Sequence, residues 1–400
     1  MSEARLRRAL GVLGALALAS ASLGCAKGQL IDVAMSGSAR ASSHRGMHVG
    51  DRMILAGDLH CHVLPPDAPY HVSRELPEVL SLAKDESLDF VVLTPHVPAR
   101  FFMDDELRGW VLRTQQDLRA RIARLEPSLV VIPGFEYTDP RYGHLGLAFA
   151  DPSEVLRGLS AEDARANPER FFELWVAGGG IVTINHPVNR PLPRSPFREL
   201  ASDLSWRGFA GGPVPPEVAW VSSHAQTLET FNTTVTELRD LFVVGEEDRS
   251  LREAAHLADH VARTQRRRFA AVGGSDSHGH WLRATTFVLA NERSAQGIRD
   301  ALAAARTCVR GPEACTLEVR PAGGAWAGVG DALTTLSPAP TTRFEGRALG
   351  DDVTFFVNGA LAGKATSGTV ATFPVPNGRC AIVRAIVGRS WSSGIYVNCF

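Results

Sequence analysis

The stretch AGDLHCHV, residues 56 to 63, places two histidines, His60 and His62, on either side of Cys61. In an extended strand, residues two apart project to the same face, so both imidazoles could bind one metal ion while Cys61 points away. We therefore expect Cys61 to be a small packed residue and not a nucleophile. A single His-x-His pattern is weak evidence for metal binding, because histidines are also common in cores and on surfaces.

More imidazoles and carboxylates lie at the ends of later apolar runs. In a parallel α/β fold the ends of the strands converge on one face, so we expect these side chains to meet in one pocket. Burying so many ionisable groups without a partner would cost several kcal/mol each, so the pattern indicates bound cations. The set comprises His96, Glu136, His144, His186, Asp276 and His278.

Seven short apolar runs, separated by longer stretches, must position these side chains. The helical patterns between them include ELPEVLSLAKDES and LREAAHLADHVARTQ. Strands that alternate with helices predict an α/β fold with a parallel sheet, open or closed into a barrel, and seven strands favour the barrel. The runs are RMILAG, DFVVLTPH, LVVIPGFE, HLGLAFA, GIVTINHP, TLETFN and RFAAVGGSDSH.

The pattern of residue types changes at about residue 313. From there to residue 400, short β-prone pieces alternate with Gly, Pro and Asn-Gly turns, which predicts a small β-sandwich-like domain with hairpins at Asn358 and Asn377. The preceding domain spans residues 53–312. Within it, the proline-rich segment from Arg190 to Ser223 is interpreted as an insertion that could cover the mouth of the barrel.

The first 25 residues have a basic start followed by small and apolar residues, which is typical of an export signal. Cys25 follows SLG and is a candidate lipidation site of a bacterial lipoprotein, and ordinary signal cleavage nearby is the alternative. Residues 26–52 then form a flexible tether. We expect a periplasmic or membrane-anchored bacterial protein, attached to a membrane only through this lipid.

Export to an oxidising compartment makes disulfides possible. Pairing Cys308 with Cys315 and Cys380 with Cys399 leaves Cys61 single, and this is one of several possible pairings. The chain has 44% hydrophobic residues, enough for a large core, and a formal net charge of −1. Mixed charges give no electrostatic footprint for nucleic acid, so a small-molecule substrate is expected as the partner.

The ordered motifs DLHCH, LTPH, PGFEYT, GHLGLAF, NHP and GSDSH resemble those of the PHP (polymerase and histidinol phosphatase) metal-dependent phosphoesterases. The resemblance covers about residues 53 to 312 and is narrower to the hydrolase branch that includes the carbamate-cleaving CehA-type enzymes. It implies a distorted (β/α)7 barrel with two or three divalent metal ions, which could be Zn, Mn or Fe.

The resemblance also implies a role for each metal-binding residue. His60, His62 and Asp276 would hold one metal, and Glu136 would bridge it to a second metal held by His144 and His186. His96 and His278 would hold a third metal, with either Asp67 or His71 as a further ligand. The family often has Asp before the histidine of the second strand, where this chain has Pro95.

The chemistry expected of such a site is hydrolysis. A hydroxide that bridges two metals would attack the phosphorus of a small phosphate ester, with Glu136, Asp276 and His278 acting through the metals. The general acid is open among Arg190, Arg100 and His280.

Three alternatives to a phosphoesterase remain. The same metals could serve a carbamate, amide or ester hydrolase. An amidohydrolase-type barrel shares the His-x-His pattern, although the SDSH ending and the PGFE glutamate favour the PHP interpretation. The last alternative is a non-catalytic surface protein that binds a partner through its β domain.

Overall fold

The computed structural model describes eleven ranges of the chain: 44–69, 71–102, 104–125, 127–139, 143–189, 205–206, 219–237, 246–279, 281–283, 285–335 and 337–400. The predicted signal segment, Cys25, the tether up to residue 43, Arg190, His280 and most of the proline-rich insertion lie outside these ranges. Among the described helices, none combines the length and apolar character needed to cross a membrane.

The fold is mixed α/β, with one large mixed sheet and a separate four-stranded sheet among the described residues. Each apolar run of the sequence corresponds to a strand. The strands of the first domain are β1 (His48–Val49), β2 (Arg52–Cys61), β3 (Phe90–Leu93), β4 (His96–Pro98), β5 (Val130–Asp139), β6 (Gly143–Ala148), β7 (Ile181–Ile184), β8 (Thr227–Asn232), β9 (Ala270–Gly274) and β10 (Thr286–Ala290).

Residues 44–49, which the sequence assigns to the tether, already belong to this fold. Strand β1 pairs antiparallel with β2, and His44 Nε2 lies 2.6 Å from Asp89 Oδ2 in a buried position. The chain is therefore ordered by these contacts before β2 begins.

Besides β1, strand direction departs from the all-parallel prediction at β6 and at β10. Strands β2, β3 and β5 are parallel neighbours, as are β7, β8 and β9, but β6 runs antiparallel to both β5 and β7. Only three residues separate Asp139 from Gly143, too few for the crossover that a parallel connection needs. Strand β10 is also antiparallel to β2.

The strand pairing also returns from β9 to β2. The connection is an isolated bridge between Cys61 and Ser277, with main-chain hydrogen bonds from Asp276 N to His60 O at 2.8 Å and from His62 N to Ser277 O at 3.2 Å. These few bonds replace a full ladder, and they bring the end of β9 beside the two histidines of β2.

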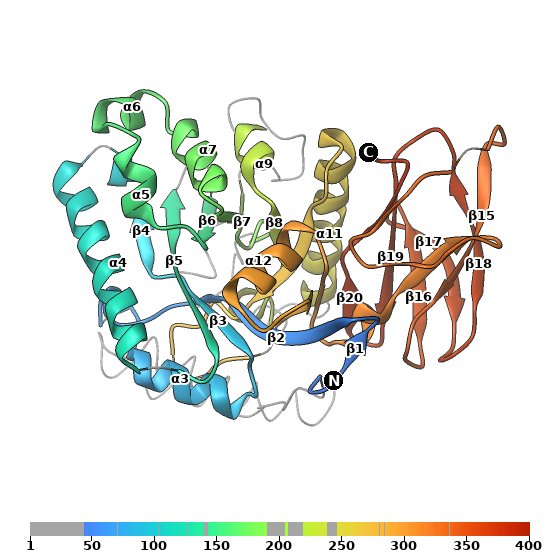
Figure 1. Cartoon of the computed structure of the whole chain (residues 1–400), viewed down its shortest axis with the longest axis horizontal. Helices are drawn as coiled ribbons and strands as arrows, with labels where there is room; N and C mark the ends of the chain where they lie inside the picture. The colour runs from blue at the N-terminus through green and yellow to red at the C-terminus, as the bar shows by residue number, and fades with distance from the viewer. Residues whose placement is uncertain are drawn as a thin grey trace.

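Helices surround these strands in Figure 1. The two helical patterns of the sequence correspond to α3 and α11, and α11 buries Leu251, Ala254, Ala258 and Val261 on one face. His224 ends a short helix that begins inside the predicted insertion and extends one residue beyond it. The helices are α3 (Leu76–Asp85), α4 (Asp105–Leu125), α5 (Pro152–Arg157), α6 (Ala161–Ala166), α7 (Glu169–Ala177), α9 (Ala219–His224), α11 (Glu246–Gln265) and α12 (Ala295–Ala303), with 3-10 turns η1 (Ala99–Phe102) and η4 (Glu313–Thr316) and a π-helical turn η3 (Thr233–Glu237).

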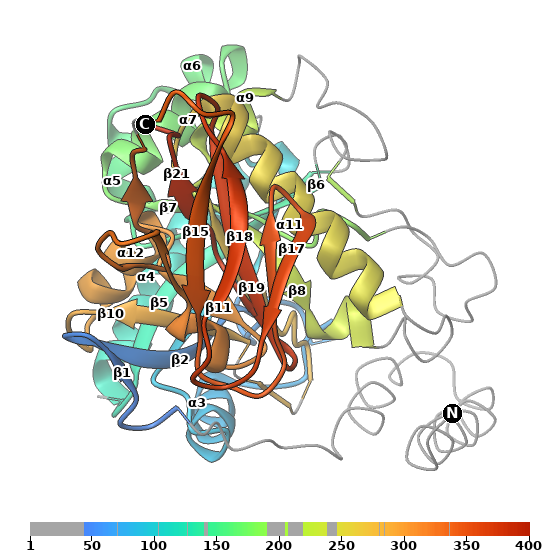
Figure 2. The ribbon, with the colours of Figure 1, turned by 90° about the vertical axis from the view of Figure 1, so that its right-hand side faces the viewer.

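The C-terminal strands form two sheets that share an apolar core, and Figure 2 views this part face-on. Phe344 and Phe373 from the four-stranded sheet pack in the same cluster as Phe355 and Val383 from the large sheet. The strands are β11 (Thr307–Val309), β12 (Glu318–Pro321), β13 (Ala327–Gly328), β14 (Ala332–Leu333), β15 (Thr341–Arg347), β16 (Val353–Val357), β17 (Ala360–Ala365), β18 (Ala371–Pro376), β19 (Ala381–Val387), β20 (Ser390–Ser392) and β21 (Ile395–Val397).

The two Asn-Gly signals have different outcomes. Asn358 and Gly359, both at positive φ, close the β16–β17 hairpin as predicted. Asn377 closes no hairpin, because β18 pairs with β15 while β19 pairs with β16, β20 and β21. Its side chain instead accepts hydrogen bonds from the hydroxyls of Thr335 and Thr342 at 2.9 and 2.8 Å, so this turn passes from one sheet to the other.

The large sheet runs without interruption from the first domain into the C-terminal strands, because β11 pairs with both β10 and β20. The two disulfides are those of the predicted pairing, Cys308–Cys315 and Cys380–Cys399. Cys61 is free and buried, which confirms its prediction as a packed residue.

Candidate metal centre

His60 and His62, at and just after the end of β2, face the same cluster of donor side chains, as the spacing predicts. We call this cluster the pocket. Nε2 of His60 lies 3.1 Å from Glu136 Oε1, and Nε2 of His62 lies 3.2 Å from Asp276 Oδ1. Cys61 packs instead in an apolar cluster that includes Val63, and burial there raises the pKa of its thiol to about 12. Such a thiol is protonated at neutral pH and is a poor nucleophile.

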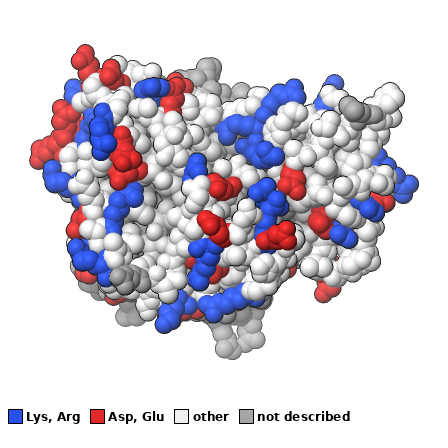
Figure 3. Space-filling model, in the orientation of Figure 1, with Lys and Arg blue, Asp and Glu red and all other residues white. Residues whose placement is uncertain are grey.

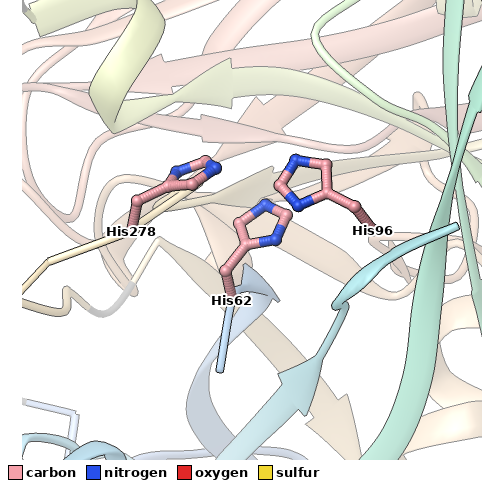
Figure 4. Close-up of side chains that lie close together, drawn as sticks. All are labelled: His62, His96 and His278. Carbon is pink, nitrogen blue, oxygen red and sulfur yellow. The ribbon is translucent and has the colours of Figure 1, made fainter. Parts of the chain in front are cut away.

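Three groups of nitrogen and oxygen donors lie in this pocket, and the donor atoms of each group fall within 4.8 Å of one another. The first two groups have the members that the family resemblance implies. The third contains His62 together with His96 and His278, whose rings face one another in Figure 4. The groups are His60, His62 and Asp276; Glu136, His144 and His186; and His62, His96 and His278.

Glu136 lies where these groups adjoin. Its Oε1 is 3.2 Å from His144 Nδ1 and 3.5 Å from His186 Nε2, in addition to its contact with His60, and its Oε2 is 3.6 Å from His96 Nε2. One carboxylate thus borders histidines from four other segments of the chain.

The antiparallel pairing of β5 and β6 fixes the position of this carboxylate. Glu136 is paired with Gly146, and Asn185 Nδ2 donates a hydrogen bond to Glu136 Oε1 at 2.9 Å. A Cβ at Gly146 would lie 3.0 Å from Asn185 Oδ1. Glycine at this position therefore leaves room for the asparagine that orients Glu136.

Asp67 and His71, the two alternatives for a further ligand, occupy different positions. The carboxylate of Asp67 accepts from Nδ1 of His62 at 3.2 Å, and from both Nδ1 and the main-chain N–H of His96 at 2.9 Å. The ring of His71 lies 4.7 Å from that of His96 and 4.8 Å from that of His278, centroid to centroid. Asp67 therefore orients the ring of His96, a role that the neighbouring Pro95 cannot take because it has no polar side chain.

Burial and the neighbouring charges shift the pKa values of the pocket in opposite directions. Burial alone would raise the pKa of Glu136 and Asp276, but the surrounding imidazoles hold both well below the usual range. Burial would lower the pKa of His62, yet its hydrogen bonds to Asp276 and Asp67 raise it to about 9. Burial, with His62 beside it, lowers the pKa of His278 well below its ordinary value.

The unmet hydrogen-bonding capacity of the pocket tests whether a cation fits. Among the described residues, His60 Nε2, His144 Nδ1 and His278 Nε2 are buried ring nitrogens without a hydrogen-bond partner. The Glu136 oxygen near the first two lies at a suitable distance but not in hydrogen-bond geometry. Buried nitrogens of this kind are costly unless something else binds them, and divalent cations are the usual ligands of such imidazole and carboxylate sets.

Of the three candidates for the general acid, Arg100 alone lies within the described residues. Arg100 is exposed in η1, and Arg190 and His280 lie outside the described residues. His224 lies in a further group of possible metal donors with Glu169 and Glu173 on α7.

Sequence reasoning missed three polar residues that touch the donors. Asn185 binds Glu136, while Glu229 and Asn232 lie on β8 and contact His60 and Asp276, respectively. The available signal was Glu229 itself, a charged residue inside the apolar run TLETFN. All three side chains are buried.

No family model and no curated protein matches the sequence. Solved structures that resemble this chain include PHP-like metal-dependent phosphoesterases. One is a two-domain protein from Bacteroides vulgatus that contains a predicted PHP-like metal-dependent phosphoesterase, at 17% identity and a TM-score of 0.46 over 90% of this chain and 98% of that one.

Two further structures cover less of the chain. A putative metal-dependent phosphoesterase from Bifidobacterium adolescentis is 15% identical, with a TM-score of 0.32 over 62% of this chain and 95% of that one. Endonuclease Q, in complex with a duplex that has an abasic lesion, is 14% identical, with a TM-score of 0.34 over 62% of this chain and 56% of that one. Because these TM-scores lie below 0.5, the likenesses carry no argument about function, which has to be inferred from the pocket residues.

Proposed function

We propose that this protein is a metal-dependent phosphoesterase of the PHP type that hydrolyses a small phosphate ester. The observation that supports this proposal is the position of Glu136, whose Oε1 lies 3.1 Å from His60 of one donor group and 3.2 Å from His144 of another. A carboxylate shared between adjacent donor groups is the arrangement by which proteins hold two cations side by side.

Some side chains of the pocket would bind the cations, and others would orient the binding side chains. His60, His62 and Asp276 would hold one cation, and His144 and His186 would hold another, with Glu136 between them. When bound, such a pair of cations lowers the pKa of water and neutralises charge on phosphoryl oxygens.

The remaining pocket residues keep those donors in place. Asn185 fixes one oxygen of Glu136, and Asp67 orients the rings of His62 and His96. Because Cys61 points away with a raised pKa, the chain contributes no thiol nucleophile here.

The finer expectations from the sequence belong to the same proposal. We infer that strands β2 to β9 form the distorted (β/α)7 barrel of the PHP fold, that His96 and His278 serve a third cation, and that the ions are Zn, Mn or Fe. We also infer export with lipidation at Cys25. We also propose a small-molecule substrate, supported by the interspersed basic and acidic side chains on the face that Figure 3 shows.

Metal analysis of the purified protein is the first test. We expect at least two equivalents of divalent metal per chain, and metal-free protein after mild purification would remove every hydrolase interpretation. Replacement of Glu136 with Ala should abolish turnover and leave the far-UV circular dichroism spectrum unchanged. Full activity of this variant would overturn the position given to Glu136.

A substrate panel then separates phosphate esters from carbonyl substrates. Hydroxide can attack either centre, so cleavage should be compared for bis-p-nitrophenyl phosphate, p-nitrophenyl phosphate and a naphthyl carbamate. Faster cleavage of either phosphate supports the proposal. Cleavage of the carbamate alone would favour the carbamate, amide or ester hydrolase instead.

A further inference from the structure

Glu229 is a carboxylate buried in the middle of a strand, where an isolated charge is costly. It lies on β8 between β7 and β9, with 3% of its surface exposed. The β8–β9 register shifts between Glu229 and Phe231. Such a bulge re-aims a side chain, and here it directs Glu229 toward the donor pocket.

The contacts of Glu229 reach both neighbouring donor groups. Its Oε1 lies 3.3 Å from Nδ1 of His60, and its Oε2 accepts a hydrogen bond from the main-chain N–H of His186 at 2.7 Å. Asn232 Nδ2 lies 3.0 Å from the same Oε2 and 3.2 Å from Asp276 Oδ2. Two side chains of one strand thus contact three expected metal ligands from three other segments.

Two of these ligands have strained backbones. His186 has a φ of 24° and Asp276 a φ of 52°, and neither is a glycine. Such conformations cost roughly 1–3 kcal/mol each and persist only when their surroundings hold them. Glu229 binds the main chain of His186, and Asn232 binds the side chain of Asp276. These two side chains therefore contact both strained residues and can hold them in place.

Close packing keeps the carboxylate against His60. A Cβ at Gly274 would lie 2.3 Å from both Glu229 Oε1 and His60 Cβ. Only a residue without a side chain allows this approach between β8, β9 and β2. The contact with His60 Nδ1 leaves Nε2 of that ring directed at Glu136.

We propose that Glu229 and Asn232 form a positioning pair that presets His60, His186 and Asp276 for cation binding. The inference rests on the proposed function, because it concerns the same cations. A carboxylate behind a ligating imidazole fixes the tautomer and orientation of the ring and increases its basicity, and loss of such a residue typically weakens metal affinity or activity about 10–100-fold.

The test compares Glu229→Gln with wild type and with Glu86→Gln. The first variant keeps the shape of the side chain and removes its charge. Glu86 is also buried but follows α3, outside the donor groups, so Glu86→Gln controls for the loss of a buried carboxylate. Zn²⁺ dissociation constants come from competition with a chromophoric chelator, and Co²⁺-loaded protein reports ligand geometry through its visible absorption.

We expect Glu229→Gln to bind Zn²⁺ about 10–100-fold more weakly and to shift the Co²⁺ bands, whereas Glu86→Gln should match wild type in both. Asn232→Ala should act in the same direction as Glu229→Gln. If Glu229→Gln keeps the affinity and spectrum of wild type, the positioning role is wrong while the proposed function stands. If wild type itself binds neither ion, the proposed function fails first.

Discussion

Asp67 offers a sharp test of the electrostatics of the pocket, because it bonds His62 and His96 at once. Replacing Asp67 with Asn keeps the size of the side chain and removes its charge. In the metal-free protein, hydrogen bonds to Asp276 and Asp67 overcome burial and raise the pKa of His62 to about 9, from an ordinary value of 6.5. The lowered pKa of Asp67 reflects the same interaction, so it is not counted again.

The sign and size of the effect follow from linkage. A histidine with a raised pKa in the folded state stabilises the protein fully below pH 6.5, and this contribution is lost as the pH rises through about 9. The shift from 6.5 to about 9 corresponds to about 3 kcal/mol in the free energy of unfolding. Since Asp276 also supports His62, we assign roughly half of this, ~1.5 kcal/mol, to Asp67.

Urea unfolding of chelator-treated protein at pH 6 and at pH 9.5 measures this effect. We expect Asp67→Asn to cost more unfolding free energy at pH 6 than at pH 9.5, by ~1.5 kcal/mol. The other groups of the pocket titrate in both proteins, so the difference between the two proteins isolates Asp67. An equal loss at the two pH values would refute the claim that Asp67 stabilises a protonated His62.

Three further predictions concern stability and reactivity. Chelation should lower the unfolding temperature in calorimetry, because a ligand at 100 times its Kd contributes about 2.7 kcal/mol; an unchanged temperature would argue against bound cations. Arg384→Met leaves Asp259 as a buried charge without its 2.6 Å partner and should cost about 3–5 kcal/mol in guanidinium unfolding, and a loss below about 1 kcal/mol would contradict this. In a Cys25→Ser protein at pH 8, Cys61 should react with a disulfide reagent only after denaturation, and rapid reaction of the native protein would contradict its burial.

The sequence predicts which side chains come together in the pocket because their chemistry is visible in their types. Histidines and carboxylates at the ends of apolar runs have few structural uses, so His60, Glu136 and Asp276 could be assigned to one pocket before any fold was known. The observed disulfide pairing was among the predicted possibilities, because cysteines that are close in sequence can pair locally.

Strand direction and orienting residues were harder to predict. An apolar run such as HLGLAFA has the same composition in either direction, and only the short connection from Asp139 to Gly143 indicates that β6 is antiparallel. Glu229 is marked as unusual by its charge inside the run TLETFN, but Glu229 and Asn232 act through contacts with segments distant in sequence, and no local pattern shows those contacts. Asn377 likewise takes its role from Thr335 and Thr342, which lie far from it along the chain.

The shared ladder through β10, β11 and β20 limits how the protein can move. A hinge between the first domain and the C-terminal strands would have to break the main-chain hydrogen bonds of β11 with either β10 or β20, so large rigid-body rotation is costly. In amide hydrogen exchange, the central strand of this junction should open together with the two strands that flank it.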